Sequence, residues 1–340
     1  MCPVTPENAV DPRYSFPMPM AIRIHALGGP EVLRWENVDV APPAAGEVQI
    51  RHNAIGLNYS DIYYRIGFYT APLPMILGAE GAGIVEAVGP EVQGIQEGDR
   101  VAYAPVHGAY SELRNLPARN AVPIPDWITD EQAAAVMLKG LMARILVRDV
   151  HAVGKDQTIL VHAAAGGVGT LVCQWAKHLG ATVIGTVGSA EKAVFAAAHG
   201  CDHPILYRDQ DFVGAVRELT GGKGVEVVYD MVGKDVFVRS LDCIRRRGLI
   251  VSIGQASGPV APVDVIALSR KGSLYLTRPG LPDFVPTREA LLGASGDLFL
   301  AIKAGVLKVE MVRRYALRDA AAAQRDLESR LTTGASILIP

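Results

Sequence analysis

A glycine-rich turn between an apolar run and an amphipathic segment is the strongest chemical signal in the sequence. The run Ile159–Val161 predicts a buried strand, and apolar residues recur at helical spacing from Val168 to Leu179. The turn at 164–169 reads AAGGVG, which matches the dinucleotide pattern G-x-G-x-x-G except for alanine at the first glycine position. Its backbone N–H groups and the helix dipole favour an anion. We therefore expect a dinucleotide pyrophosphate at Ala165, Gly166, Gly167, Val168 and Gly169.

The region after the next strand indicates which dinucleotide is expected. NAD-binding domains usually carry Asp or Glu about 20 residues past the first glycine, where it accepts from the ribose 2′-hydroxyl. The segment Gly185–Ser189 holds no acid, and Lys192 follows one turn into the next helix. A cation at that place suits a 2′-phosphate. The sequence thus predicts NADP(H), and the alternative is that Lys192 is an ordinary lysine on a solvated helix face.

These residues require a sheet to position them. Strand patterns alternate with helix patterns of roughly ten residues, and this alternation predicts right-handed crossovers and a parallel sheet. We expect a Rossmann doubly wound domain, with a ligand-free α/β domain as the alternative. The expected strands lie at 181–187, 204–207, 225–229, 249–253 and 273–277, and the expected helices at 191–199 and 211–219, with another that ends at Gly248.

The first third of the chain has a different pattern, with short strands separated by Gly and Pro. This pattern predicts an antiparallel, barrel-like domain, followed by a helix from Asp130 to Val150. The last residues, 335–340, read ASILIP, and a tail this apolar is expected to return to the first domain. The nucleotide domain would then be an insertion. The expected parts are an N-terminal extension (1–20), a β-rich catalytic domain (21–137 and 281–340) and a Rossmann domain (138–280).

Composition restricts the class of partner. The chain has 340 residues, 49% of them hydrophobic and 20% charged, with a net charge of −2. This balance is ordinary for a globular enzyme and offers neither a basic field for nucleic acid nor a polybasic membrane patch. Four cysteines without a C-x-x-C pair and eight histidines without ligand spacing indicate no metal site and a reducing, cytoplasmic location.

Taken in order, several motifs resemble one family. They are GLNYSD (56–61), GAEGAG (78–83), LKG (138–140), HAAAGGVG (162–169), YDMVG (229–233), RRGLIVSIG (246–254) and the terminal ILIP. Together they look like the NADPH-dependent quinone oxidoreductases of the zeta-crystallin type, within the medium-chain dehydrogenase/reductase superfamily. The resemblance covers the chain after residue 20 and implies a GroES-like catalytic domain with an inserted Rossmann domain. It also implies NADPH as cofactor, a quinone as substrate and a homodimer joined through the Rossmann domains.

The resemblance further implies roles for individual residues. The 2′-phosphate end of the cofactor would contact Gly188, Ser189, Lys192, Tyr207 and Arg330. The nicotinamide end would be surrounded by Asn58, Asp61 and Tyr63 as catalytic residues, by Tyr69 and Lys139 as substrate residues, and by Gly254 and Gln255 in a loop that closes over it.

The same comparison implies chemistry without a metal. Zinc enzymes of the superfamily place a cysteine near Asn58 or Tyr59 and a histidine where Ala79 stands, and those ligands are missing here. Without zinc the acceptor must itself be electron-poor, as a quinone is, or another donor must stabilise the developing oxyanion. We expect the Tyr63 hydroxyl and the Asn58 amide to donate to the acceptor oxygen, while Asp61 fixes the local geometry.

Two alternatives remain at this point. A reductase of α,β-unsaturated ketones or aldehydes is chemically close, because a quinone is itself an enone. A non-catalytic NADPH-binding protein, either a lens-type structural protein or a binder of A/U-rich RNA, is the alternative of another class. The weakly acidic charge balance argues against strong RNA affinity.

Overall fold

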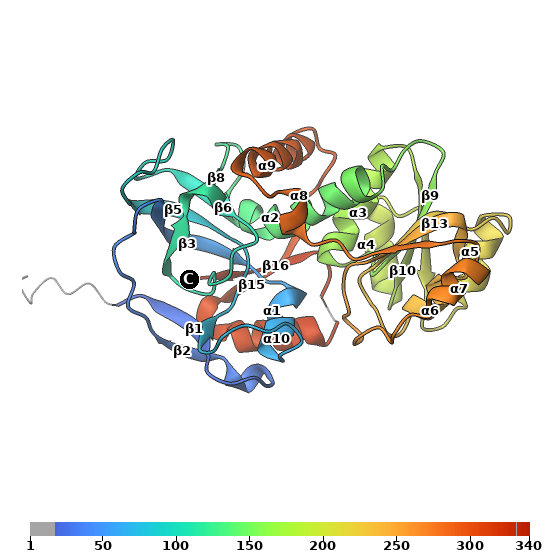
Figure 1. Cartoon of the computed structure of the whole chain (residues 1–340), viewed down its shortest axis with the longest axis horizontal. Helices are drawn as coiled ribbons and strands as arrows, with labels where there is room; N and C mark the ends of the chain where they lie inside the picture. Colours follow the sequence, from blue (N-terminus) through green and yellow to red (C-terminus); the bar gives the residue numbers. More distant parts are fainter. Residues whose placement is uncertain (1–17, 331) are drawn as a thin grey trace, which may run out of the picture.

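The molecule consists of two units at the two ends of its long axis (Figure 1). The computed structural model describes residues 18–330 and 332–340. The chain begins in a β-rich unit, crosses to a unit built on a parallel sheet, and returns, so that the blue and red parts of the ribbon lie together. One buried apolar cluster lies within the β-rich unit, a second covers one face of the parallel sheet, and a third covers the other face and continues into the strands of the β-rich unit.

The parallel sheet has six strands in the order β11-β10-β9-β12-β13-β14. Every neighbouring pair in it is parallel. In chain sequence this order is 3-2-1-4-5-6, that of a dinucleotide-binding sheet, which confirms the expected Rossmann fold class. The strands are β9 (Thr158–His162), β10 (Thr182–Val187), β11 (His203–Leu206), β12 (Val225–Asp230), β13 (Ile244–Ser252) and β14 (Tyr275–Thr277).

Side chains of each central strand alternate between two covered faces. Ile159 and Val161 pack with residues of α2 and α3, whereas Leu160 packs on the opposite face with residues of α5 and α6. Because helices cover both faces, both sets of positions are apolar. The helices are α1 (Tyr59–Arg65), α2 (Asp130–Ile145), α3 (Gly167–His178), α4 (Ala190–Ala198), α5 (Phe212–Leu219), α6 (Phe237–Ser240), α7 (Val265–Arg270), α8 (Leu281–Phe284), α9 (Arg288–Lys303) and α10 (Ala320–Glu328).

The prediction of a helix that ends at Gly248 is wrong. The helix in this region, α6, stops at Ser240, and β13 already begins at Ile244. Exposed arginines at 245–247 interrupt the apolar pattern from which strands are recognised, and they lie in a bulge between Ile244 and Leu249, the two residues at which β13 pairs with β12 on either side. Arg247 has φ of +60°, and its N–H donates to a carbonyl outside the strand. The strand therefore tolerates a local irregularity that resembles a helix end in the sequence.

The β-rich unit contains a seven-stranded and a three-stranded sheet, with strand orders β15-β16-β3-β5-β6-β8 (β7 pairs with β3) and β2-β1-β4. The C-terminal tail does return to it, because β16 pairs with β3. Most of the expected extension, residues 1–17, lies outside the described residues. The strands are β1 (Met20–Ile24), β2 (Arg34–Asn37), β3 (Glu47–Gly56), β4 (Met75–Ile76), β5 (Gly81–Val88), β6 (Arg100–Tyr103), β7 (Leu113–Pro117), β8 (Val122–Pro123), β15 (Met311–Ala316) and β16 (Ala335–Ile339).

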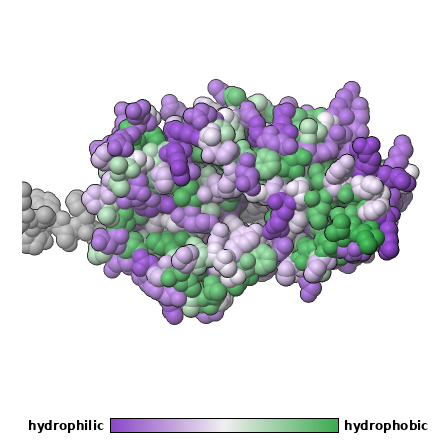
Figure 2. Space-filling model, in the orientation of Figure 1, coloured by the Kyte–Doolittle hydropathy of each residue, from purple (hydrophilic) through white to green (hydrophobic). Residues whose placement is uncertain are grey.

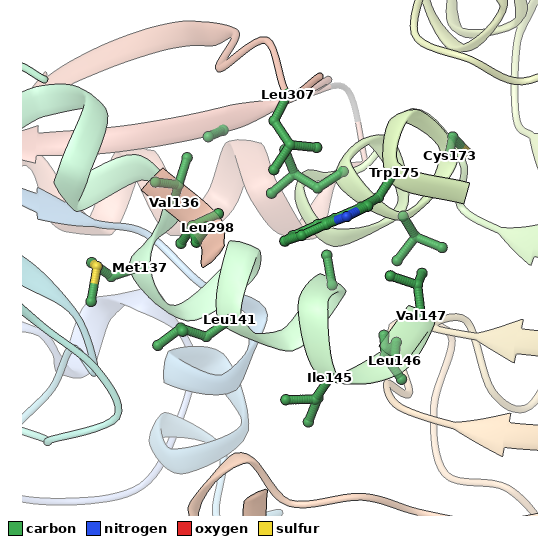
Figure 3. Packing of buried hydrophobic residues seen from close by; sticks show 14 of the residues in the cluster. Val136, Met137, Leu141, Ile145, Leu146, Val147, Cys173, Trp175, Leu298 and Leu307 are labelled. Atoms are coloured by element: carbon green, nitrogen blue, oxygen red, sulfur yellow. The ribbon is translucent and has the colours of Figure 1, made fainter. Parts of the chain in front are cut away.

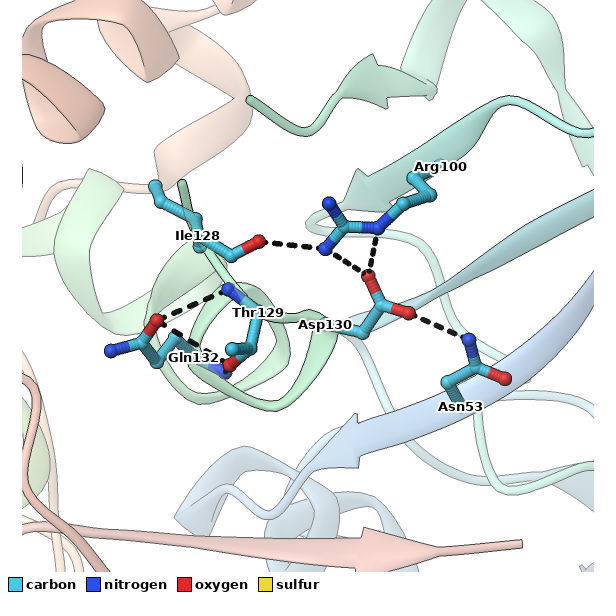
Figure 4. Close-up of polar contacts among 6 residues, drawn as sticks. All are labelled: Asn53, Arg100, Ile128, Thr129, Asp130 and Gln132. Atoms are coloured by element: carbon cyan, nitrogen blue, oxygen red, sulfur yellow. Dashed lines mark hydrogen bonds and ion pairs between the residues drawn. The ribbon is translucent and has the colours of Figure 1, made fainter. Parts of the chain in front are cut away.

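Helix α2 begins in a polar anchor on the β-rich unit (Figure 4). Thr129 and Gln132 form a capping box, in which the Gln132 N–H donates to Thr129 Oγ1 at 3.2 Å and Gln132 Oε1 accepts from the Thr129 N–H at 3.1 Å. The Asp130 carboxylate accepts from Arg100 of β6 at 2.6 Å and from Asn53 of β3 at 2.6 Å. The start of α2 is thereby fixed to two strands.

The other end of α2 is buried against the Rossmann unit (Figure 3). Leu141, Ile145 and Leu146 are fully buried in one cluster with Trp175 of α3 and Leu298 of α9. The helix thus connects the two units, and the expected domain boundary between residues 137 and 138 falls inside it. No helix within residues 18–330 and 332–340 is both long and apolar enough to cross a membrane.

Candidate functional site

The glycine turn has the geometry that close approach of a phosphate requires. Gly166 caps α3, whose first turn carries no acidic residue, so no carboxylate of that turn competes with an anion for its N–H groups. A Cβ on Gly169 would lie 2.2 Å from the carbonyl oxygen of Ala163, so only glycine lets α3 begin this close to β9. The C-terminal segment also reaches the turn, because the Gly334 N–H donates to the Ala165 carbonyl at 3.0 Å.

Three cations gather at the end of β10, next to the turn. Ser189 caps α4 by accepting from the Lys192 N–H at 3.4 Å, and the Lys192 ammonium donates to the Arg330 carbonyl at 2.5 Å. Burial and the positive charges of Arg208 and Arg330 lower the pKa of Lys192. Arg330 has one carboxylate at its edge, Asp235, at 3.7 Å. A bound anion would relieve the mutual repulsion among Lys192, Arg208 and Arg330.

The remaining residues expected at the 2′-phosphate end lie beside these cations. Gly188 follows β10, and a Cβ on it would approach the guanidinium carbon of Arg208 to 3.6 Å. Tyr207 follows β11, and its N–H donates to the Val187 carbonyl at 3.3 Å. The structure therefore brings the ends of two neighbouring parallel strands and the end of α10 to one place.

The start of α1 forms the opposite end of the site. Asn58 caps this helix, and its N–H donates to Asp61 Oδ2 at 2.9 Å. Asp61 Oδ2 also accepts from the Tyr110 hydroxyl at 2.9 Å. Burial raises the pKa of Asp61 to about 7, despite these two bonds. The Asn58 amide nitrogen donates to Glu80 Oε1 at 2.8 Å, so this group is engaged within the protein.

Lys139 is held in a buried ion pair in the middle of α2. Its ammonium lies 2.5 Å from Glu80 Oε1, and both side chains are almost inaccessible to solvent. The second oxygen of Glu80 accepts from the Leu138 N–H at 2.6 Å. A Cβ on Gly167 would lie 2.8 Å from Lys139 Cδ, so the lysine stem lies against the glycine turn. Lys139 therefore joins the α1 end of the site to the pyrophosphate end.

Tyrosines of the β-rich unit contact a loop of the Rossmann unit, residues 254–258, here called the closing loop. The Gln255 N–H donates to the Tyr63 hydroxyl at 2.6 Å, and the Tyr59 hydroxyl donates to the Ala256 carbonyl at 3.3 Å. Burial raises the pKa of Tyr63 to about 12. The Tyr69 hydroxyl accepts from Arg278 at 2.9 Å. This region, where α1 and the tyrosines meet the closing loop, is called the junction below.

The residues fit a dinucleotide with a 2′-phosphate better than they fit a zinc ion. The anion-accepting turn, the three clustered cations and the buried Gln255 Oε1, which has no hydrogen-bond partner among the described residues, are all groups that such a ligand would satisfy. Two buried carboxylates bond to Asn58: Asp61, which also accepts from Tyr110, and Glu80, which is already bound by Lys139. A carboxylate neutralised by an ammonium is a poor zinc ligand. The two nearby positions where zinc enzymes of the superfamily carry Cys and His are occupied here by Asn58 and Ala79, which do not bind zinc.

Three residues of the site are not among those expected from the sequence: Arg208, Glu80 and Arg278. Arg208 directly follows the selected Tyr207, and Glu80 lies within the quoted GAEGAG motif, so proximity to selected residues was the available signal. Arg278 has no such signal, because it comes to the site from the last strand of the sheet. The residues expected from the sequence fall into two groups, and buried Lys139 contacts both, since its stem lies against Gly167 and its ammonium is held by Glu80.

Comparisons with known proteins agree with this geometry. Residues 44–126 match the family model "Alcohol dehydrogenase GroES-like domain", and residues 167–278 match "Zinc-binding dehydrogenase". The quinone oxidoreductase of Salmonella typhimurium is 52% identical, over 95% of this chain and all of the relative. The 2-haloacrylate reductase of a Burkholderia species is 45% identical, over 95% of this chain and 99% of the relative.

A solved structure shows the same likeness in three dimensions. The Escherichia coli quinone oxidoreductase, crystallised in complex with NADPH, superposes with a TM-score of 0.93 at 50% identity. The match covers 94% of this chain and all of that chain. With this extent of identity along almost the whole sequence, the chain belongs to the quinone oxidoreductase family of the medium-chain dehydrogenase/reductase superfamily.

Proposed function

We propose that this protein is an NADPH:quinone oxidoreductase that works without a metal. The observation that carries the cofactor choice is the group of Lys192, Arg208 and Arg330 at the end of β10, next to the glycine turn. Family membership supports the quinone as acceptor. Gly188, Ser189 and Tyr207 complete the 2′-phosphate end, and the turn from Ala165 to Gly169, including Gly166, Gly167 and Val168, holds the pyrophosphate.

NADPH supplies the hydride, and the protein orients the two reactants. Gln255 Oε1 is buried and has no hydrogen-bond partner among the described residues, so it would be an acceptor for an N–H group of the bound cofactor. Gly254 starts the closing loop, where a Cβ would lie 2.7 Å from the Met231 carbonyl. Lys139 fixes the reactive end relative to the turn, because its stem lies against Gly167 while its ammonium is held by Glu80.

Tyr63 donates its hydroxyl proton to the acceptor oxygen in this proposal and regains a proton from water, with direct protonation of the reduced anion by water as the alternative. The Tyr63 hydroxyl oxygen accepts from the Gln255 N–H. The hydroxyl proton is not used in that bond and is available to a substrate. A pKa near 12 keeps that proton in place at neutral pH. Tyr69 contacts the acceptor beside Tyr63, since the two rings meet edge to face with centroids 5.3 Å apart.

Asn58 and Asp61 have positioning roles. The Asn58 amide donates to Glu80, which replaces the expected bond to the acceptor, and Asp61 holds the start of α1 through the Asn58 N–H. Together they fix the helix that carries Tyr63. A quinone suits such a site, because its reduced anion is aromatic and demands no strong general acid.

A second candidate function is reduction of a conjugated carbon–carbon double bond. It is favoured by the 45% identity to the 2-haloacrylate reductase, whose name describes an α,β-unsaturated acid as substrate. The site geometry suits both acceptors, because both need a hydride at an electron-poor carbon near a hydrogen-bond donor.

The experiment that separates the two functions measures NADPH oxidation with 1,4-benzoquinone, with a simple alkenone and with 2-chloroacrylate in parallel. The first proposal expects turnover of the quinone at the highest kcat/KM. Faster turnover of either alkene would make the second candidate the function. NADPH binding without turnover of any acceptor would instead favour a non-catalytic protein, and a gel-shift assay with an A/U-rich RNA would then test the nucleic-acid alternative.

The metal-free reaction has its own test. Dialysis against EDTA should leave quinone turnover unchanged, because Glu80 is occupied by Lys139 and the chain offers no Cys or His at Asn58 or Ala79. Activity that disappears with EDTA and returns with added zinc would contradict this part of the proposal.

We also propose a homodimer through the Rossmann sheets and a cytoplasmic location. Strand β14 is an edge strand among the described residues, and apolar surface is exposed by Tyr275 and Leu276 on it and by Val265 and Ile266 on α7. Figure 2 shows hydrophobic surface gathered over α6 and α7 at that end of the molecule. Buried cysteines in the thiol form suit a reducing compartment. We keep the domain division expected from the sequence as a proposal, with a catalytic domain at 21–137 and 281–340 and a Rossmann domain at 138–280.

A further inference from the structure

Arg278 lies at the carboxyl edge of the parallel sheet, in a row of polar residues that the proposed reaction does not use. Asp230 at the end of β12 is paired with Ser252 at the end of β13. Val251 is paired with Thr277 at the end of β14, so Ser252 and Arg278 are the next residues of their strands in the same register. In open α/β sheets, ligands bind outside this edge.

Within residues 18–330 and 332–340, the hydrogen bonds of the Arg278 guanidinium all go to neutral acceptors. Its Nη1 donates to Ser252 Oγ at 3.2 Å and its Nη2 donates to the Tyr69 hydroxyl at 2.9 Å. None of the ion pairs within the described part of the chain includes Arg278. A guanidinium has five N–H donors, so further donors are available to a ligand. The side chain is exposed, and a ligand that enters the junction from solvent can reach it.

The nearby carboxylate does not neutralise this charge by direct contact. Asp230 Oδ1 accepts from the N–H groups of Val232 and Gly233 at 2.8 and 2.9 Å, and burial raises the pKa of Asp230 to about 6. Burial raises the pKa of both Asp230 and Tyr63, and the positive charge of Arg278 opposes this by lowering both pKa values. Its field therefore extends to the hydroxyl that we propose as proton donor.

We infer that Arg278 binds an acidic substituent, a carboxylate or sulfonate, on the electron acceptor, so that the enzyme prefers anionic quinones to neutral ones. This inference rests on the proposed function and names the substrate class of the same site. A planar guanidinium fork matches the two oxygens of such a group better than the Tyr69 hydroxyl does. On substrate entry the acidic group replaces Tyr69 as the acceptor, and Tyr69 turns its hydroxyl to the substrate.

The test compares a matched pair of acceptors, 1,2-naphthoquinone and 1,2-naphthoquinone-4-sulfonate, with NADPH as donor. The ratio of kcat/KM for the sulfonate to kcat/KM for the neutral quinone is measured in the wild type and in Arg278→Gln. Comparison of ratios removes the intrinsic difference in reactivity between the quinones. The ratio should fall about tenfold in Arg278→Gln, because a charge-assisted pair at an exposed site is partly screened by water. Raising the ionic strength should lower the wild-type ratio and leave that of Arg278→Gln nearly unchanged.

Three further variants make the result specific. Arg278→Lys keeps the charge without the fork and should retain part of the preference. Arg51→Gln removes an arginine of β3 that pairs with Glu86, outside the site, and should keep the wild-type ratio. Tyr69→Phe removes the acceptor that the acidic group would displace from Arg278, so the ratio should stay at or above the wild-type value even if both rates fall.

The contrary outcomes are distinct. An unchanged ratio in Arg278→Gln, with neutral quinone still reduced, would overturn the inference and leave the proposed function intact. An equal loss of the ratio in Tyr69→Phe would also overturn it, because Arg278 would then act only by holding Tyr69. A wild type that oxidises NADPH with neither quinone would overturn the proposed function and the inference together.

Discussion

At the scale of single residues, Lys192 offers the most direct test of cofactor choice. Its ammonium lies among the charges of Arg208 and Arg330 and would gain a charge-assisted bond from a 2′-phosphate. Lys192→Ala should therefore weaken NADPH binding about ten- to a hundredfold, the equivalent of roughly 1.5 to 3 kcal/mol. Fluorescence titration measures this change. NADH lacks the 2′-phosphate and serves as the internal control, since its weaker binding should hardly change; equal loss for both dinucleotides would contradict the assignment.

Asp61 gives a residue-scale prediction that depends on pH. Burial raises its pKa to about 7 in the folded protein, above the ordinary value of 3.8. Between these values the folded state binds more protons than the unfolded state, so the contribution of Asp61 to stability falls as pH rises from about 4 to about 7. Asp61→Asn keeps an acceptor for Asn58 and Tyr110 but cannot ionise. Urea unfolding should show the wild type losing stability relative to Asp61→Asn across this window, and a constant difference would refute the raised pKa.

At the scale of elements, α2 is the part that connects the two ends of the site. Its capping box is exposed, yet the helix carries Lys139 and packs against both units. Thr129→Ala should cost about 0.5 to 2 kcal/mol in the free energy of unfolding, because the Gln132 N–H loses its acceptor. Thr129→Ser keeps the oxygen and is the matched control in the same urea titration. A loss of equal size in Thr129→Ser would show that the cap does not account for the effect.

Elements also show how far sequence reasoning extends. The turn at Gly166 and the strand that precedes it follow from local pattern, because a dinucleotide turn needs glycine at fixed spacing and a buried strand needs an apolar run. The start of β13 does not follow from local pattern, because the exposed arginines at 245–247 interrupt the apolar run. Arg278 was also missed. Its place at the edge of the sheet depends on the register of β13 with β14, which is a long-range property that no local pattern reveals.

At the scale of the whole molecule, the exposed edge of the Rossmann sheet predicts the quaternary structure. In the part of the chain that the structure describes, strand β14 is paired on one side only, and α7 exposes Val265 and Ile266 by 75% and 58%. Edge strands with adjacent apolar surface favour pairing with a second copy. Two such edges related by a two-fold axis would join the sheets of both subunits and bury these side chains.

The mass of the particle in solution tests this arrangement. Multi-angle light scattering after gel filtration should give twice the chain mass of 36.2 kDa for the wild type. Ile266→Glu places a charge in the centre of the proposed contact and should shift the particle toward one chain mass, since burial of an unpaired carboxylate opposes association. Leu300→Glu is the matched control, because Leu300 is 63% exposed on α9, in a different element from the proposed contact. A wild type with the mass of one chain, or dissociation in Leu300→Glu as readily as in Ile266→Glu, would show that β14 and α7 do not form the interface.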